Sequence, residues 1–151
     1  MNEKPHVLIL CTGNSARSQM AEGLLRHLAG DRFDVESAGI HPSFVRPEAI
    51  AVMGELGIDV SHHRSKSVEE FLGEPFDFVI TVCDHAREHC PLFPGPAQRI
   101  HWSLEDPAAF QGSDDERLEK FREIRDRIGE KLREFLAARN PIATSGGSRS
   151  V

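Results

Sequence analysis

The clearest chemistry in the chain lies in residues 11–18. They read Cys11, Thr12, Gly13, Asn14, Ser15, Ala16, Arg17 and Ser18. Small residues let several backbone N–H groups turn towards one centre and form an anion-binding nest. A planar guanidinium can hold two oxygens of a tetrahedral oxyanion, and the combined positive field favours a thiolate. The segment therefore predicts an oxyanion-binding loop over residues 12–18, with Cys11 as nucleophile and Arg17 as the oxyanion clamp.

The spacing of Cys11 and Arg17 is weak evidence by itself. The chain has three Cys and 18 Lys and Arg residues, so a Cys with a basic residue six positions later also arises by chance. A buried, inert Cys11 and an unrelated surface Arg17 are the alternative. The segments on either side of the loop favour the functional interpretation, because a strand before it and a helix after it would add the positive end of a helix dipole.

Hydrophobic periodicity predicts the elements that hold this loop. Strands are expected at 6–10, 33–37, 76–82 and 99–103, with the third of them central because it is the most apolar. Helices are expected at 17–28, 47–56 and 113–136. Alternating strands and helices predict an α/β fold with a parallel sheet. Sites in such sheets lie beyond the carboxyl ends of the strands, which is where Cys11 stands.

Residues typical of helix ends mark the same helices. Ser15 is expected to cap the first helix, while Pro47 opens the second and Gly57 ends it. Ser113 and Glu116 have the spacing of a capping box at the start of the third.

Length and composition predict one domain over residues 1–139, followed by a Pro-, Ser- and Gly-rich tail at 140–151 that we expect to be disordered. A net charge of -6 argues against general nucleic-acid binding. No apolar run approaches the length of a membrane span or of a signal-peptide core, so the chain is expected in the cytoplasm. Three cysteines, an odd number, favour catalytic or redox thiols over a disulfide framework.

Residues 7–22 resemble the signature of low-molecular-weight phosphatases and of their arsenate reductase relatives. The similarity covers residues 6–136 and is clearest at 37–39, 57–58, 81–84 and 101–107. It implies a four-stranded parallel sheet flanked by helices, a flavodoxin-like three-layer sandwich. It also implies that Asp106, in front of Pro107, is the general acid that protonates a departing oxygen. The adjacent Glu105 is the rival for that role.

Cys83 and Cys90 follow the most apolar strand at a separation that resembles the thioredoxin-coupled arsenate reductases. The resemblance implies a relay. Cys11 would attack arsenate, Cys83 would attack Cys11 and release arsenite, and Cys90 would attack Cys83 and free Cys11. Thioredoxin or a similar thiol reductase would return the electrons, and no bound cofactor is expected.

Two alternatives remain for this pair of thiols. They could be inert core cysteines, or they could join His85 and His89 as ligands of a structural zinc ion, although the spacing is not that of a standard finger. A continuous helix over 83–90 would separate the two Cα atoms by about 10 Å, more than the roughly 7 Å that a disulfide tolerates. The segment is therefore expected to loop, or to unwind on oxidation. His62 and His63 are expected in a solvated loop.

The chain departs from the family in ways that favour the reductases. Ala16 replaces a second loop cysteine, Gln19 stands where phosphatases usually have Pro, and the chain contains no Tyr. Some reductases hold a potassium ion through residues that match Asn14, Glu22 and Ser37 together with an acidic side chain. Here Lys66 stands at the acidic position, so its ammonium is expected either to replace the ion or to point into solvent.

Three functions are compatible with these residues. The first is reduction of arsenate through the three thiols. The second is hydrolysis of phosphotyrosine or aryl phosphates, for which Cys11 and Asp106 would suffice. In either case the loop is expected to accept arsenate or phosphate. The third is a non-catalytic oxyanion or redox sensor. The pair Cys83 and Cys90 favours the first.

Overall fold

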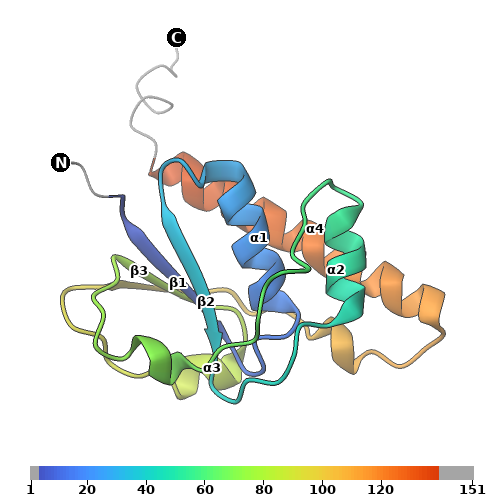
Figure 1. Ribbon diagram of the computed structural model, residues 1–151, viewed down its shortest axis with the longest axis horizontal. Helices are drawn as coiled ribbons and strands as arrows, with labels where there is room; N and C mark the ends of the chain where they lie inside the picture. The colour runs from blue at the N-terminus through green and yellow to red at the C-terminus, as the bar shows by residue number, and fades with distance from the viewer. Residues whose placement is uncertain (1–3, 140–151) are drawn as a thin grey trace, which may run out of the picture.

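A computed structural model describes residues 4–139 (Figure 1). Four parallel strands form one sheet in the order β2-β1-β3-β4. The strands are β1 (His6–Cys11), β2 (Asp34–Gly39), β3 (Phe78–Thr81) and β4 (Gln98–His101). The predicted parallel α/β sheet is confirmed, and β3 is an interior strand as expected, although shorter than predicted.

Helices cover both faces of this sheet (Figure 1). Three of them pack together on one face: α1 (Arg17–Ala29), α2 (Pro47–Gly54) and α4 (Asp114–Ala138). The short α3 (Asp84–Glu88) lies on the other face, against β1 and β3. Two 3-10 turns complete the fold, η1 (Val68–Phe71) and η2 (Pro107–Ala109). Periodicity predicted the three longer helices but neither α3 nor the 3-10 turns, because one turn of helix is too short to produce a repeat.

The core lies on both sides of β1. Residues 7–10 of this strand are fully buried, as expected of an interior parallel strand between two helical layers. The apolar stripe of α1 packs onto the sheet through Met20, Leu24 and Leu25. The stripe of α4 closes the same face, and its predicted apolar positions are all buried: Phe121, Ile124, Ile128, Leu132, Phe135 and Leu136.

The helix ends agree with the sequence at the start of α2 and of α4, but not at the end of α2 or the start of α1. Ser113 and Glu116 form the predicted capping box, each side chain bonded to the other's backbone N–H. Gly57 has a φ of 77°, a conformation that favours glycine, but α2 ends at Gly54 with Glu55 as its C-cap, so the helix stops before the predicted end at Gly57. The prediction that Ser15 caps α1 was wrong: the N-cap is Ala16, and no side chain caps the helix. The first amides of α1 therefore remain available to an anion.

Cys11 ends β1, at the point where the order in which strands are added to the sheet reverses. The chain leaves β1 towards β2 on one side, whereas it leaves the neighbouring β3 towards β4 on the other side, so the connections after β1 and β3 lead in opposite directions. A crevice forms at such a switch point in open α/β sheets. The loop at 11–18 lies there, as its position after the first strand predicted.

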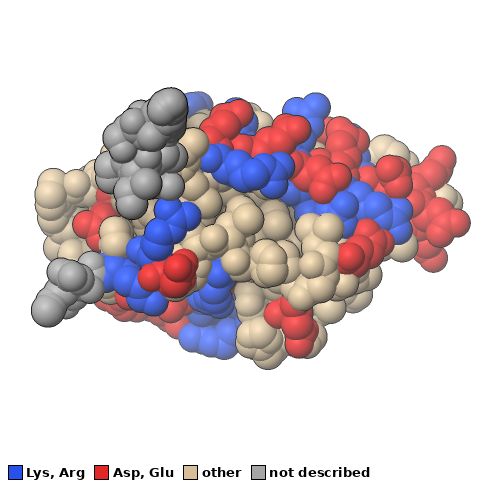
Figure 2. Space-filling model, turned by 90° about the horizontal axis from the view of Figure 1, so that it is seen from above, with Lys and Arg blue, Asp and Glu red and all other residues tan. Residues whose placement is uncertain are grey.

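On the face seen in Figure 2, Lys and Arg side chains alternate with Asp and Glu and do not gather into one basic area. On α4, basic side chains pair with acidic ones, as Arg122 does with Glu119 and Lys120 with Glu123. Within residues 4–139, no helix combines the length and the apolar character needed to cross a bilayer. The tail predicted at 140–151 lies outside the described residues.

Candidate active site at the Cys11 loop

The carbonyl groups of the loop point outwards, which leaves its N–H groups for the centre. The carbonyl oxygen of Thr12 accepts a hydrogen bond from the His41 N–H at 2.8 Å, and that of Ser15 accepts one from Arg46 at 2.9 Å. The carbonyl oxygen of Gly13 accepts a bond from the Ser65 hydroxyl at 2.8 Å. The segments after β2 thus hold the loop open as an anion nest.

Asn14 fixes the loop from beneath. It is fully buried and has a φ of 48°, a left-handed conformation that Asn tolerates better than most residues. Its Nδ2 donates to the hydroxyls of Ser18 at 2.7 Å and Ser37 at 3.0 Å. Its Oδ1 accepts from the Gln19 side chain at 2.9 Å and from the Lys66 N–H at 2.8 Å. Every polar atom of this side chain is used in holding the loop.

Cys11 lies at the base of the nest and is only 2% exposed. Its Sγ accepts a hydrogen bond from the Asn14 N–H at 3.2 Å and lies 2.9 Å from the Ser18 hydroxyl oxygen. Because that oxygen already accepts from Asn14 Nδ2, its hydrogen is free to point at the sulfur. Two donors are thus aimed at this sulfur and hold it at the base of the nest.

Arg17 and Asp106 meet at the same pocket. Arg17 donates from Nη1 to the Leu104 carbonyl at 2.9 Å, and its Nη2 lies 3.7 Å from Asp106 Oδ2. The other Asp106 oxygen accepts from the Ala108 N–H at 3.0 Å. Glu105, the rival acid, is instead 3.0 Å from Lys120 Nζ and does not line the pocket. The geometry therefore favours Asp106 as the acid.

The pocket has a volume of about 200 Å³. Seven of its lining residues were expected. Asp106 lies on one side, and the loop side of the wall is formed by Cys11, Thr12, Gly13, Ser15, Ala16 and Arg17. Asn14 and Ser18, also predicted to bind the oxyanion, do not line it but lie behind the loop. Ser43, Arg46 and Ala108 complete the wall. Sequence reasoning missed these three because each is far from the loop along the chain and carries no motif.

Cys83 adjoins the loop, as the relay requires. It is buried, and its Sγ lies 3.2 Å from the hydroxyl oxygen of Thr12, the residue after Cys11. The same sulfur accepts from the Ala86 N–H at 3.4 Å, which makes Cys83 the N-cap of α3. The dipole of this short helix adds a small positive field at the sulfur.

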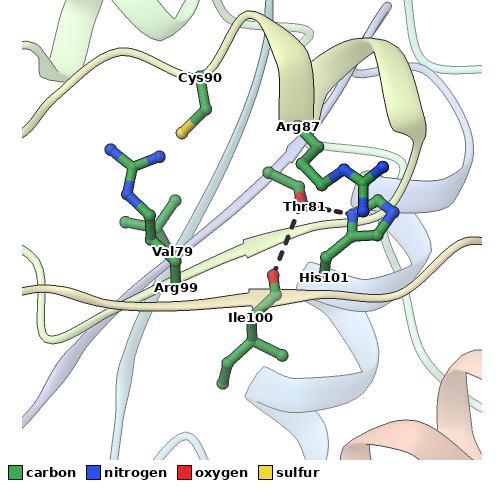
Figure 3. Close-up of a pocket in the computed structure, with 7 residues that line it drawn as sticks. All are labelled: Val79, Thr81, Arg87, Cys90, Arg99, Ile100 and His101. Atoms are coloured by element: carbon green, nitrogen blue, oxygen red, sulfur yellow. Dashed lines mark hydrogen bonds between the residues drawn. The ribbon is translucent and has the colours of Figure 1, made fainter.

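Cys90 lies two residues beyond α3 and is half-buried. It lines a separate cavity together with residues of α3, β3 and β4, and none of the residues that line this cavity lines the Cys11 pocket (Figure 3). All three thiols are unpaired. The chain therefore brings Cys83 to the Cys11 loop but holds Cys90 apart from both, with α3 between the two later cysteines.

The predicted zinc alternative has no geometric support in this part of the chain. Among residues 4–139, no group of three or more His, Cys, Asp or Glu side chains is arranged to hold a metal ion. The His85 and His89 rings stack on each other with centroids 4.2 Å apart, and His89 Nδ1 faces the His85 carbonyl at 2.9 Å.

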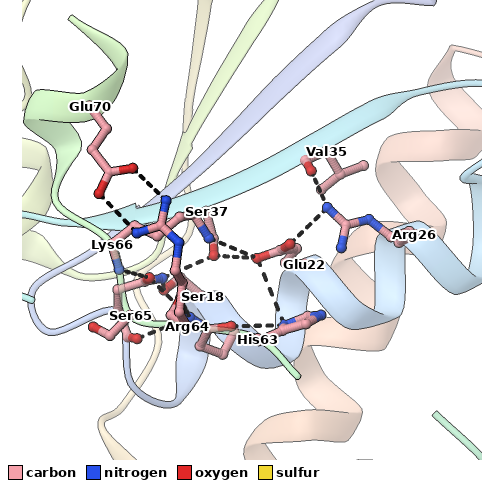
Figure 4. Close-up of polar contacts among 12 residues, drawn as sticks. Ser18, Glu22, Arg26, Val35, Ser37, His63, Arg64, Ser65, Lys66 and Glu70 are labelled. Atoms are coloured by element: carbon pink, nitrogen blue, oxygen red, sulfur yellow. Dashed lines mark hydrogen bonds and ion pairs between the residues drawn. The ribbon is translucent and has the colours of Figure 1, made fainter. Parts of the chain in front are cut away.

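A buried charge network lies behind the loop (Figure 4). Glu22 is 3% exposed; its Oε1 accepts from the Ser37 hydroxyl at 2.5 Å and lies 3.8 Å from Lys66 Nζ. Its Oε2 is 2.7 Å from Arg26 Nη2. Lys66 is buried, so the alternative in which it points into solvent was wrong. With an ammonium at the acidic position, these residues do not fit a monovalent cation.

His63 also belongs to this network, against expectation. Its side chain is 5% exposed, and its Nδ1 lies 2.9 Å from Gln19 Oε1, while His62 is exposed as predicted. Burial lowers the pKa of His63, and the Glu22 carboxylate at 3.9 Å opposes that effect in part. Gln19 then donates to both oxygens of Asn14, so His63 supports the loop through one intermediate side chain.

Comparison with known proteins gives the same family as the site. A family model described as low molecular weight phosphotyrosine protein phosphatase matches residues 6–142. The arsenate reductase of Halalkalibacterium halodurans is 44% identical over 135 residues, which cover 89% of this chain and 96% of that protein. The arsenate reductase of Bacillus subtilis is 41% identical over 133 residues, covering 88% and 96%.

Solved structures agree. An arsenate reductase in the oxidised state superposes with a TM-score of 0.76 at 34% identity, covering 88% of this chain and 97% of that one. A thioredoxin-dependent arsenate reductase of Corynebacterium glutamicum gives 0.69 at 31% identity, covering 91% and 62%. A low molecular weight protein tyrosine phosphatase from T. tengcongensis gives 0.73 at 27% identity, covering 89% and 99%. The chain therefore belongs to the low molecular weight phosphotyrosine protein phosphatase family, in the group that contains its arsenate reductase relatives.

Proposed function

We propose that this protein reduces arsenate to arsenite through Cys11, Cys83 and Cys90. The observation that carries the proposal is the contact between Cys83 and the loop, with its Sγ 3.2 Å from the Thr12 hydroxyl. Hydrolysis of a phosphate ester needs one thiol and one acid, whereas a reduction needs a second thiol within reach of the first. The 34–44% identity to arsenate reductases supports the same activity.

The first stage consumes the arsenate. The Cys11 thiolate attacks arsenic held by the loop amides and Arg17, and Asp106 donates a proton to the oxygen that leaves. Cys83 then attacks Cys11 Sγ. A bond forms between the two sulfurs, and the electron pair of the broken sulfur–arsenic bond passes to arsenic. Arsenic gains two electrons and leaves as arsenite, and the two thiols become one disulfide.

The second stage moves the disulfide away from the pocket. Cys90 attacks Cys83, which releases Cys11 for another turnover. The segment is not a continuous helix over 83–90: α3 spans only 84–88, Cys83 is extended in front of it and Cys90 lies beyond it. We expect the segment to rearrange further when this bond forms, because the two sulfurs must come into bonding distance across α3. The new disulfide then becomes accessible to a thiol reductase of the thioredoxin type. Three unpaired thiols and such a donor suit the reducing cytoplasm.

Lys66 replaces the cation that some relatives hold behind the loop. Its ammonium supplies a permanent positive charge near Glu22, where it is 3.8 Å from Oε1. Ser37 and Asn14 connect this carboxylate to the loop, so the pair keeps the nest in place without a bound ion.

The test is arsenate-dependent NADPH oxidation in the presence of thioredoxin and thioredoxin reductase. Wild type is expected to turn over, and single Ser variants of Cys11, Cys83 and Cys90 are expected to stop. A silent wild type that cleaves an aryl phosphate in a manner dependent on Cys11 and independent of Cys90 would make the protein a phosphatase. Tight arsenate binding with no turnover of either substrate would make it a sensor.

A further inference from the structure

Cys90 faces a cavity that the Cys11 pocket does not share. This cavity has a volume of about 250 Å³, and the Val79 side chain of β3 lies at its floor, whereas Ile100 of β4 lines it through its backbone and directs its side chain to the other face of the sheet (Figure 3). Three basic side chains line it: Arg87 from α3, and Arg99 and His101 from β4. No acidic residue is among the described residues that line it. A thiol at this cavity therefore lies in a partly apolar, positively charged environment.

Arg99 is held in a position to act on that thiol. Its backbone is fixed in the sheet, where Arg99 pairs with Val79. Its Nη2 donates to the carbonyl oxygen of Pro91, the residue after Cys90, at 2.8 Å. Figure 3 shows the Cys90 sulfur directed towards the Arg99 guanidinium. One side chain thus holds the turn that carries Cys90 and places a positive charge beside its sulfur.

Two effects act on the ionisation of Cys90. Burial raises the pKa of its thiol, and the positive charge of Arg99 opposes that rise in pKa. Arg87 and His101 line the same cavity without a comparable effect on this thiol. The balance leaves Cys90 mostly protonated at rest, so the rate of any attack by this residue depends on the thiolate fraction that Arg99 maintains.

We propose that Arg99 is a positioning residue that orients Cys90 and favours its thiolate for the second thiol exchange. The inference rests on the relay proposed above. In this step Cys90 loses its proton to solvent and its sulfur attacks Cys83 in the Cys11–Cys83 disulfide. The Cys83–Cys90 bond forms, the Cys11–Cys83 bond breaks, and Cys11 leaves as a thiolate. One disulfide replaces another, so no external oxidant or reductant is needed.

The direct test isolates the Cys90 thiol. In a variant carrying both Cys11→Ser and Cys83→Ser, Cys90 is the one remaining thiol. Its rate of alkylation by iodoacetamide is measured from about pH 6 to about pH 11, with Arg99→Gln, Arg99→Lys and, as matched control from the same cavity, Arg87→Gln. We expect R99Q to shift the profile to higher pH and to slow alkylation at neutral pH about threefold to tenfold, R99K to shift it less, and R87Q to leave it within about twofold.

A purely structural role for Arg99 would not move this pH profile, so an unchanged midpoint in R99Q overturns the inference. If the double Ser background does not fold, mass spectrometric counting of Cys90 labelling in the chain with all three thiols gives the same comparison. In the full enzyme, R99Q is expected to release one arsenite per chain at the wild-type rate and then to accumulate the Cys11–Cys83 disulfide. Undiminished steady-state turnover in R99Q, with C90S inactive, refutes the role of Arg99 and leaves the relay intact. A wild type without arsenate turnover refutes the relay itself.

Discussion

The hydroxyl oxygen of Thr12 lies 3.2 Å from the Sγ of Cys83, although 71 residues separate them along the chain. Thr12 is adjacent to Cys11, so this contact connects the loop to the second thiol of the proposed relay. This hydrogen bond holds the Cys83 sulfur at the loop.

Replacing Thr12 with Val removes this hydroxyl at nearly constant volume. We expect the release of arsenite in a single turnover to slow about fivefold to tenfold, the effect of losing one hydrogen bond of about 1 kcal/mol. Thr12→Ser keeps the hydroxyl and is the control. Rapid quenching of a single turnover measures both rates, and equal rates in the two variants would mean that the contact has no catalytic effect.

Asp106 and Glu105 provide a matched pair for identifying the acid. Asp106→Asn keeps an oxygen for the Ala108 N–H but cannot donate a proton as a carboxyl does. We expect kcat for arsenate to fall about 10²- to 10⁴-fold. Glu105→Gln should retain the wild-type kcat, because Glu105 pairs with Lys120 outside the pocket. Steady-state kinetics on both variants decide the assignment, and a large loss in E105Q alone would reverse it.

The contact between Lys66 and Glu22 predicts an enzyme that does not respond to potassium. Wild-type turnover and Tm should be the same in potassium chloride and in choline chloride at equal ionic strength. In wild type the Lys66 ammonium lies 3.8 Å from Glu22 Oε1. Lys66→Asp replaces this ammonium with a second carboxylate near Glu22 and should lower the free energy of unfolding by about 1–3 kcal/mol. Added potassium should restore part of that loss. A large rate increase of the wild type on adding potassium would contradict the proposal that Lys66 replaces the ion.

His63 predicts that stability falls in mild acid. Its pKa is lowered in the folded state, chiefly by burial, so the unfolded chain binds the proton first as the pH falls. The stability contributed by neutral His63 is complete above the unfolded pKa of about 6.5, and is lost as the pH falls below it towards the lower folded value. His63→Gln should remove this part of the pH dependence. Urea unfolding of wild type and His63→Gln, above and below a pH of about 6.5, measures this difference in the free energy of unfolding. If the free energy of unfolding changes equally with pH in both proteins, His63 is not the source.

Gly39 faces the loop closely enough to exclude a side chain. A Cβ at this position would lie 2.7 Å from the Thr12 carbonyl oxygen and 2.9 Å from the Asn14 nitrogen. Gly39→Ala should displace the loop, lower the free energy of unfolding by about 1–3 kcal/mol and reduce arsenate turnover. Gly54→Ala is the control, because a Cβ there meets no atom within 4 Å. Thermal unfolding and turnover of the two variants test this, and equal effects would show that contact with the loop is not the cause.

The sequence by itself determined the elements and the loop. The apolar run before Cys11, the helical repeat after Arg17 and the capping box at Ser113 act through backbone hydrogen bonds and side chains a few residues apart. Such local signals are complete in a linear sequence, so strand, loop and helix could be predicted with their order. The alternation of elements also determined the parallel sheet and the end at which the site lies.

Only the tertiary structure decided which side chains meet at that end. The contact of Thr12 with Cys83, the burial of Lys66 beside Glu22, and the position of Arg99 beside Cys90 each join residues from different elements. Such contacts exist only after the strands pair in register and the helices pack. A side chain's burial and its partner then depend on packing rather than on neighbours in sequence. For that reason Lys66 could be placed beforehand only as one of two alternatives, and His63, expected in solvent, has a side chain that is only 5% exposed.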